Sequence, residues 1–342
     1  MSRHRHTRRA ILAAATFLAA ASVQAETADE FYARQPLRII VGYGPGSGYD
    51  AYGRLLARHL GRFLPGNPNV VVQNMPGAGA ITATNHLYTL AAKDGSVIGL
   101  VASSALLEPV YGREGARFDP AQFTWIGNMD ESIGTCSVWH TSGIERLEDL
   151  KTKEAVFGGS GPAGVNSQHA AALKNLLGLQ IKLVQGYPGA TEVKLAIVKG
   201  ELHGGCGFAL SSLKSAHGHE FRSGQLRPII QLGLEKHSEL GGVPHVYDYA
   251  RSDEDRQVFD LVFGSHVLGR PVMAPPGIPD DRKLVLRKAF METMADPAFQ
   301  AEADKLNLPI KPTDGAGVER FFARFLGAPK TVVQRASAAM RE

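Results

Sequence analysis

The chain has 342 residues, of which 44% are hydrophobic, with 37 basic and 33 acidic side chains that give a net charge of +4. That length is sufficient for two domains with their own cores. Four arginines within the first nine residues account for the whole charge excess. The rest of the chain is therefore balanced, which argues against a nucleic-acid-binding protein, because such proteins need a basic surface.

The N-terminal segment has the features of an export signal in their usual order. Its arginines precede an apolar stretch at residues 10–21, which is too short to cross a bilayer, and Val23-Gln24-Ala25 fits a small-x-small cleavage motif. We expect residues 1–25 to be a signal peptide cleaved after Ala25, which leaves a soluble protein of 317 residues in the periplasm. A retained membrane anchor is the alternative, and both the Sec and the twin-arginine export routes stay open.

A glycine-rich turn follows the first predicted strand. Residues 37–41 form an apolar run, residues 44–50 read Gly-Pro-Gly-Ser-Gly-Tyr-Asp, and residues 51–63 have the pattern of an amphipathic helix. Backbone N–H groups of such a turn can approach a ligand, and the helix N-terminus behind it favours negative charge. The turn lacks the lysine of a P-loop and the glycine spacing of a dinucleotide site, so we expect no cofactor.

The remaining elements alternate between strands and helices. Strands are predicted at residues 70–72, 97–101, 156–157, 181–184 and 227–232, and helices at about 80–92, 167–177, 191–200, 280–295 and 318–341. Three strand-to-helix connections are again rich in glycine, at residues 74–79, 158–167 and 186–191. This alternation predicts an α/β protein with mostly parallel sheets. In the helix at 280–295 we expect the apolar residues to face a core, namely Leu284, Leu286, Ala289 and Phe290.

Two cysteines, Cys136 and Cys206, occur in this chain. An oxidising compartment favours a disulfide between them, and two small buried thiols are the alternative. Neither cysteine is part of a motif with the residue spacing of a metal-binding site. The triplet His217-Gly218-His219 lies in a polar segment typical of an exposed loop, so we expect no metal site.

The order of these motifs resembles the substrate-binding proteins of tripartite tricarboxylate transporters, the extracytoplasmic solute receptors known as the Bug family. Residues 44–50 are similar to that family's A-P-G-G-x-x-D loop, and residues 74–79 match its N-x-P-G-A-G loop. Asp94-Gly95 falls at its D-G-Y motif, and residues 184–190 are similar to its V-P-Y-x-G segment, with a shift around the tyrosine. The resemblance covers residues 36–329, although residues 202–208 lack an acidic residue that the family usually has there.

The resemblance implies a two-lobed periplasmic-binding-protein fold of the Venus-flytrap, type II-like kind. Each lobe would be a mostly parallel sheet flanked by helices. Lobe 1 would comprise residues 26–130 and 262–342, and lobe 2 residues 131–261, with crossings near residues 128–132 and 260–270. Family members hold a ligand carboxylate with loop amides, hydroxyls and waters instead of an arginine. None of the glycine-rich turns here contains Lys or Arg, which fits that mode of binding.

The function implied by the resemblance is that of a receptor and not of an enzyme. It would capture a small organic acid between two hinged lobes and deliver it to the membrane subunits of a tripartite tricarboxylate transporter. We expect a monomer without a nucleic-acid partner. An exported hydrolase that uses the same cleft is one alternative, although residues 158–162 end in proline where a G-x-S-x-G nucleophile motif has glycine. A ligand sensor for a membrane signalling partner is another.

Carried over to this sequence, the resemblance implies a set of ligand-binding residues in the glycine-rich turns and at strand ends. They are Tyr43, Gly46, Ser47, Gly48, Asp50, Gly77, Ala78, Gly79 and Ser103 from lobe 1, and Ser160, Asn166, Ser167 and Tyr187 from lobe 2. Structural roles are the alternative for single side chains. Asp50 could pair with Arg54 one helical turn later, Ser47 could serve as an N-cap, and both tyrosines could be packing residues.

Overall fold

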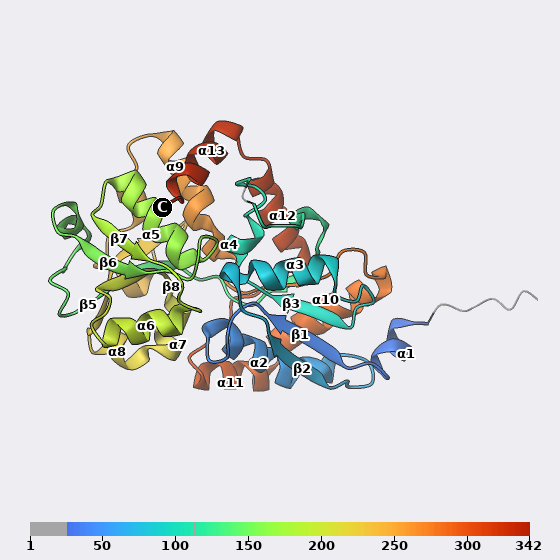
Figure 1. Cartoon of the computed structure of the whole chain (residues 1–342). Coiled ribbons are helices and arrows are strands. Elements are labelled where there is room, and N and C mark those ends of the chain that lie inside the picture. The colour runs from blue at the N-terminus through green and yellow to red at the C-terminus, as the bar shows by residue number, and fades with distance from the viewer. Residues whose placement is uncertain (1–25, 113) are drawn as a thin grey trace, which may run out of the picture.

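The strands of the protein form two separate sheets, one in each of two lobes (Figure 1). The structure is a computed structural model that describes residues 26–112 and 114–342, so the expected export signal lies outside the described residues. In Figure 1 the lobe with the blue and cyan strands β1, β2 and β3 lies beside the lobe with the green and yellow strands β5, β6, β7 and β8. The two-lobed α/β fold class expected from the sequence is confirmed.

The first sheet has the strand order β11-β4-β10-β3-β1-β2. Its strands are β1 (Leu37–Val41), β2 (Val70–Asn74), β3 (Val97–Leu100), β4 (Thr124–Asn128), β10 (Pro271–Ala274) and β11 (Thr313–Asp314). Strand β1 lies next to the edge strand β2 and pairs in parallel with both β2 and β3. The apolar residues of β1 are fully buried, as is usual where helices cover both faces of the parallel part of a sheet.

The second sheet has the strand order β7-β6-β8-β5-β9. Its strands are β5 (Gly134–Trp139), β6 (Ala155–Gly158), β7 (Ile181–Val184), β8 (Gly204–Ala209) and β9 (Leu226–Leu232). β6 pairs in parallel with β7 and β8, whereas β5 is antiparallel to β8 and β9. A disulfide joins Cys136 of β5 to Cys206 of the neighbouring β8. Both cysteines are fully buried.

Both sheets are mixed, which differs from the expectation of mostly parallel sheets. The reason lies in how the chain passes between the lobes. The chain leaves the first sheet at the C-terminal end of β4 and returns to it at the N-terminal end of β10. Pro271 at the start of β10 therefore pairs with Asn128 at the end of β4, and the two strands run in opposite directions. In the second sheet β5 likewise begins where β8 and β9 end, with Gly134 opposite Ala209 and Leu232.

The two segments that connect the sheets lie side by side. Residues 129–133 lead from β4 to β5, and residues 264–270 lead back to β10. Backbone hydrogen bonds join them, from Ser132 N to His266 O (3.1 Å) and from Gly269 N to Asp130 O (2.9 Å). We call these segments the outgoing and the return crossing. Their pairing places the connection between the lobes in one small region.

Helices flank both sheets (Figure 1). They are α1 (Ala28–Tyr32), α2 (Gly48–Leu60), α3 (Ile81–Thr89), α4 (Ser103–Leu106), α5 (Val165–Leu177), α6 (Ala190–Val198), α7 (Leu210–Ala216), α8 (Gly218–Arg222), α9 (Asp253–Phe263), α10 (Asp280–Ala295), α11 (Pro297–Lys305), α12 (Gly315–Leu326) and α13 (Lys330–Ala339). Within the described residues, no helix combines the length and the apolar character needed to cross a bilayer.

One expectation for the C-terminal helices was wrong. Leu284 of α10 is 64% exposed, because it lies on the solvent side of the helix, whereas Leu286, Ala289 and Phe290 are buried as expected. The segment at residues 318–341 is largely helical as predicted, but it is divided into two helices, α12 and α13, separated at residues 327–329. Pro329 at the N-cap of α13 explains the break, since proline cannot continue a helix from the preceding turn.

Helix α13 packs on elements of the middle of the chain, although it follows helix α12, which lies on the first sheet. It contacts α5 and α9, and the Asn175 side chain of α5 donates hydrogen bonds to the carbonyls of Ala339 (2.8 Å) and Arg341 (2.7 Å). The Ser337 hydroxyl donates to the Tyr111 carbonyl (3.0 Å), in the segment that follows β3. The C-terminus therefore contacts both lobes.

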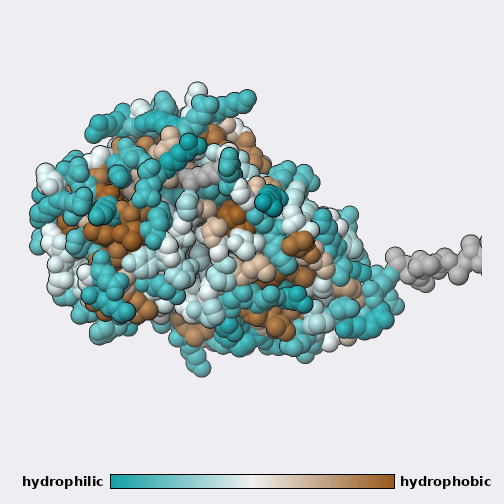
Figure 2. Space-filling view, viewed as in Figure 1, coloured by the Kyte–Doolittle hydropathy of each residue, from teal (hydrophilic) through white to brown (hydrophobic). Residues whose placement is uncertain are grey.

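Buried apolar side chains form one cluster that includes residues of both lobes, among them Trp125 of β4 and Phe157 of β6. A second cluster lies within the first lobe and a third within the second. Polar residues cover most of the face shown in Figure 2, and apolar residues gather there in separate groups. The lobes are thus packed against each other in this structure through a shared core.

Candidate functional site

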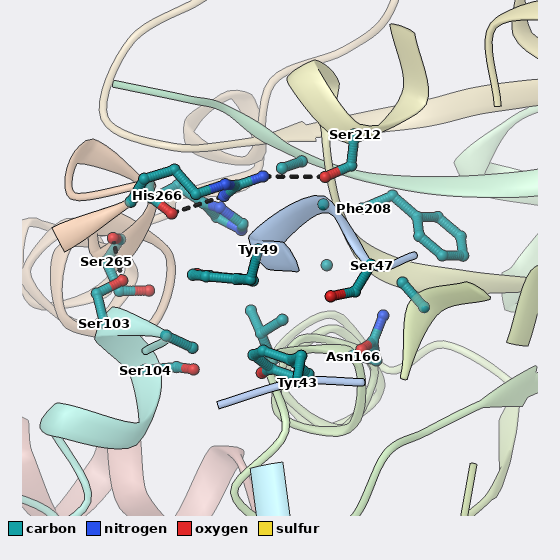
Figure 3. Close-up of a pocket in the computed structure, with 18 residues that line it drawn as sticks. Tyr43, Ser47, Tyr49, Ser103, Ser104, Asn166, Phe208, Ser212, Ser265 and His266 are labelled. Carbon is teal, nitrogen blue, oxygen red and sulfur yellow. Dashed lines mark hydrogen bonds between the residues drawn. The ribbon is translucent and has the colours of Figure 1, made fainter. Parts of the chain in front are cut away.

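A pocket with a volume of about 60 Å³ lies between the two lobes, and we call it the interlobe pocket (Figure 3). Its lining comes from the ends of β1, β3 and β8, from the starts of α5, α6 and α7, and from the return crossing. The lining residues are Tyr43, Ser47, Gly48, Tyr49, Ala102, Ser103, Ser104, Val165, Asn166, Ala190, Gly207, Phe208, Ala209, Ser212, Ser265, His266, Gly269 and Arg270. Open α/β sheets bind ligands at such strand ends.

The β1–α2 turn supplies four of these residues. The Ser47 side chain caps α2 by accepting a hydrogen bond from Asp50 N (3.2 Å), which confirms the expected N-cap, and Ser47 also lines the pocket. The rings of Tyr43 and Tyr49 stack with centroids 4.9 Å apart. Burial raises the pKa of both phenols, so both stay protonated and can act as hydrogen-bond donors at neutral pH.

Asp50 does not line the pocket, and its carboxylate is engaged in joining two turns. It accepts hydrogen bonds from Gly46 N (2.9 Å), Arg54 Nε (2.9 Å) and Asn74 Nδ2 (2.9 Å). Asn74 also donates to the Tyr43 carbonyl (2.9 Å). The ion pair with Arg54 confirms the structural alternative for Asp50. The bonds to Gly46 and Asn74, which the sequence did not predict, connect the first glycine-rich turn to the start of the second. Gly46 lies at the exposed tip of its turn and does not line the pocket.

Two neighbouring serines at the end of β3 differ in their bonding. The Ser103 hydroxyl donates to the Ser265 carbonyl of the return crossing (2.6 Å), so it joins the first lobe to the crossing. The Ser104 hydroxyl is buried and has no hydrogen-bond partner among the described residues. Because a buried hydroxyl without a partner is unfavourable, Ser104 is the better candidate for a bond to a ligand.

The second-lobe residues expected at the site fall in three places. Asn166 at the start of α5 lines the interlobe pocket, and its amide donates to the Cys206 carbonyl (2.7 Å). Ser160 lines a different cavity and donates to Asn166 Oδ1 (3.4 Å). Ser167 lines neither cavity, since its hydroxyl donates to Gln185 Oε1 (2.7 Å), which also accepts from Gly161 N (3.1 Å).

The different cavity, which we call the outer cavity, is formed by the other glycine-rich turns. Its lining residues are Gly42, Tyr43, Pro76, Gly77, Ala78, Gly79, Ala80, Ser160, Gly161, Gly186, Tyr187 and Pro188. Tyr43 lines both cavities, so its side chain forms part of the wall of each. The residues expected at a single site are thus divided between two adjacent spaces.

The second glycine-rich turn approaches the opposite lobe very closely. Gly79 has a φ of +66°, and Ala78 and Ala80 also have positive φ values, which are unusual for residues with a side chain. A Cβ atom added to Gly79 would lie 2.5 Å from Gly164 N and 2.6 Å from Ala163 C. Glycine is therefore required at position 79 by both backbone conformation and space.

Arg270 is the permanently charged side chain among the residues that line the interlobe pocket, and the sequence analysis did not predict it. Its Nη2 donates to Ser212 Oγ (3.0 Å), and its Cζ lies 4.4 Å from the ring centroid of Tyr49. Gly48 makes room for this arrangement, because a Cβ at that position would lie 2.5 Å from Ser212 Oγ and 3.2 Å from Arg270 Nη2. Arg270 lies in the return crossing, outside the glycine-rich turns, so the lack of Lys and Arg in those turns gave no sign of it.

Two histidines are buried beside the pocket. His266 lines it, and its ring lies 5.0 Å from the ring of fully buried His169. Burial lowers the pKa of His169 to about 4 and holds the pKa of His266 well below its usual value, with the neighbouring His169 and Arg270 adding to the effect at His266. Both imidazoles are neutral at pH 7. Among the described residues, no group of three or more His, Cys, Asp or Glu side chains could hold a metal ion.

Sequence comparison relates this chain to Bug proteins, although no family model matches it. Protein BugT of Bordetella pertussis is 41% identical over 91 residues, which are 27% of this chain and 27% of BugT. The matched stretch thus spans only about a quarter of that relative's length. A UPF0065 protein of Bordetella bronchiseptica is 25% identical over 290 residues, which are 83% of this chain and 80% of that protein.

Solved structures show the same fold over nearly the whole described chain. The periplasmic binding protein BugD has a TM-score of 0.72 at 17% identity, covering 90% of this chain and 98% of its own. MatC from Rhodopseudomonas palustris with bound malate (TM-score 0.68, 15% identity) covers 90% and 99% of the two chains. A second R. palustris protein with adipate (TM-score 0.67, 16% identity) covers 90% and 97%. The resemblance to the Bug receptor family is therefore confirmed, and the chain has the two-lobed fold of periplasmic solute-binding proteins.

Proposed function

We propose that this protein is an extracytoplasmic receptor that binds a small organic acid in the interlobe pocket and delivers it to the membrane subunits of a tripartite tricarboxylate transporter. The observation that carries the proposal is the pocket itself, which takes its lining from both lobes and from the return crossing. A ligand bound there contacts both lobes at once. It therefore stabilises the closed arrangement of the lobes, which is how a hinged receptor traps its solute.

The chemistry of the lining favours an anionic ligand. Serine hydroxyls and protonated phenols are donors, the turn at the start of α2 presents backbone N–H groups, and Arg270 adds a positive charge. Carboxylates accept hydrogen bonds from all of these groups. The bound malate and adipate in two proteins of the same fold agree with a small acid as the ligand here.

The proposal also divides the chain into an export signal and two lobes. The export signal would be residues 1–25, cleaved after Ala25, and the mature protein would act as a periplasmic monomer. Lobe 1 would comprise residues 26–130 and 262–342, and lobe 2 residues 131–261, with hinge motion in the two crossings. Tyr43, Ser47, Gly48 and Asn166, which all line the interlobe pocket, would contact the acid. Ser104 would bind it in place of Ser103, whose hydroxyl is bonded to the return crossing. The residues that line the outer cavity would close the route by which the acid enters the interlobe pocket.

Thermal unfolding of the purified protein with a panel of mono-, di- and tricarboxylates tests the proposal. At a ligand concentration of a hundred times the dissociation constant, the binding acid should raise the free energy of unfolding by about 2.7 kcal/mol. Mass spectrometry of the same samples should recover the acid unchanged after prolonged incubation. Chemical conversion of the acid would instead support an enzyme, and the lack of any stabilising acid in the panel would refute the receptor proposal.

A further inference from the structure

Arg270 is almost completely buried at the edge of the interlobe pocket. Its side chain is 2% exposed, and the guanidinium lies between two aromatic rings, with Cζ 4.4 Å from the ring centroid of Tyr49 and 4.7 Å from that of Tyr52. Its backbone is fixed as well, because Arg270 N donates to Asn128 Oδ1 (2.9 Å) at the end of β4. These contacts fix the position of the cation at the point where the lobes meet.

The hydrogen bonds of this guanidinium are incomplete. Nη1 donates to the Gly269 carbonyl (2.6 Å), and Nη2 donates to Ser212 Oγ (3.0 Å) and more distantly to Ser211 Oγ (3.4 Å). Nε is buried and has no partner among the described residues. A guanidinium carries five N–H donors, so neutral oxygens satisfy only part of its capacity here.

The charge of Arg270 is also incompletely compensated. None of its described contacts is an ion pair with a carboxylate. Its acceptors are a carbonyl, two serine hydroxyls and the phenol of Tyr49. Asp130 in the outgoing crossing is buried near enough for Arg270 to lower its pKa, but burial raises that pKa more strongly. The described contacts of the guanidinium itself are thus all with uncharged groups. A buried cation without a full counter-charge is unfavourable, and a bound anion relieves it.

We propose that Arg270 is the residue that recognises the charge of the ligand: its guanidinium binds a carboxylate group of the acid in the interlobe pocket. This inference rests on the proposed function and adds to it the residue that distinguishes an acid from a neutral solute of the same shape. Arginine suits this role because its planar fork matches the two oxygens of a carboxylate. The resemblance to Bug receptors implies carboxylate binding without an arginine, so this chain departs from that mode.

The position of Arg270 links recognition to closure of the lobes. Its backbone belongs to the return crossing, Ser212 belongs to α7 of the second lobe, and Tyr49 and Tyr52 belong to α2 of the first. A carboxylate bound to Arg270 therefore lies where groups from both lobes converge. A neutral ligand makes no comparable contact and leaves the cation uncompensated.

Binding of acids and of their amides, measured by titration calorimetry, tests this proposal. The probes are the carboxylate of the panel that binds best and the analogue in which its carboxylate groups are replaced by primary amides. The wild-type protein should bind the acid at least tenfold more tightly than the amide. In Arg270→Gln the affinity for the acid should fall by about 10- to 100-fold, and the acid-to-amide preference should approach one.

Arg282→Gln is the matched control. Arg282 is also buried, has an unpartnered Nε and lies over an aromatic ring, Phe31, but it belongs to α10 and does not line the pocket. Its loss should lower stability without changing the acid-to-amide preference. Arg270→Lys retains the positive charge but lacks the planar guanidinium. This variant should therefore keep the acid-to-amide preference and bind the acid with reduced affinity.

The outcomes separate this inference from the proposed function. If the wild-type protein binds no carboxylate, the receptor proposal fails and this one fails with it. If the wild-type protein binds the acid but Arg270→Gln keeps the same preference, only the role of Arg270 is refuted. Equal binding of acid and amide by the wild-type protein refutes that role without any variant, so the test does not depend on the folding of Arg270→Gln.

Discussion

Acidification should destabilise this protein through His169, which belongs to α5 and is fully buried against the end of α9. Its Nε2 lies 3.1 Å from the Val262 carbonyl, its Nδ1 has no partner among the described residues, and its ring contacts the rings of Phe263 and His266 at 5.0 Å. Protonation would therefore place a charge in an apolar environment with nothing to compensate it. Burial lowers the pKa of His169 from 6.5 to about 4 in the folded protein.

The sign of the effect follows from linkage between protonation and folding. The unfolded chain takes up the proton near pH 6.5, whereas the folded protein takes it up only near pH 4, so the contribution to stability is complete above pH 6.5 and is lost as the pH falls to about 4. Between pH 7 and pH 5 this one group should lower the free energy of unfolding by about 2 kcal/mol.

Urea unfolding of the wild-type protein and of His169→Gln at pH 7, 6 and 5 measures this contribution. Glutamine can still donate to the Val262 carbonyl but does not titrate, so the variant should lose about 2 kcal/mol less than the wild type over that pH range. His266 is present in both proteins, but His169 helps to lower its pKa, so the difference between the two proteins reports His169 together with its coupling to His266. An identical loss of stability in the two proteins would refute the account of His169 as a buried neutral base.

Three further substitutions test other parts of the structure. Gly79→Ala should weaken binding of the acid more than tenfold and should lower the free energy of unfolding by less, because the added Cβ would meet Gly164 of the other lobe. An unchanged affinity in calorimetry would contradict the close approach of residues 79 and 164. Asp50→Ala should lower the free energy of unfolding by about 2–3 kcal/mol, because it removes the acceptor of three hydrogen bonds; a loss below about 0.5 kcal/mol in urea unfolding would contradict this role. Replacing Cys136 and Cys206 together by serine should cost about 2–5 kcal/mol, and reduction of the wild-type disulfide should have the same effect on the thermal unfolding curve.

Local sequence patterns predicted much of the fold, because strand, turn and helix signals act over few residues. The strand at 37–41 and the helix at 280–295 have the predicted bounds, and Gly178 ends α5 in the left-handed conformation. Strand β8 was not predicted, since three of its six residues are glycine and carry no strand signal. One of them, Gly207, allows β8 to approach the start of α5, where a Cβ would lie 2.9 Å from Val165 C.

The composition of the site was harder to predict than its location. The glycine-rich turns do surround the space between the lobes, but sequence spacing does not show which turns share a cavity. Arg270 and Asn128 are 142 positions apart and are brought together by pairing between β4 and β10. The free Ser104 hydroxyl and the bonded Ser103 hydroxyl are neighbours in sequence, and only the path of the return crossing distinguishes them.

Helix α13 gives the two lobes a third attachment in addition to the crossings. A rotation that separates the lobes must either carry α13 away from α5 and α9 or bend the chain at residues 327–329, where the helix is interrupted. Helix α13 would thus act as a tether that limits how far the two lobes could separate. In the proposed receptor, the width of the entrance for a solute would then depend in part on a segment remote from the pocket.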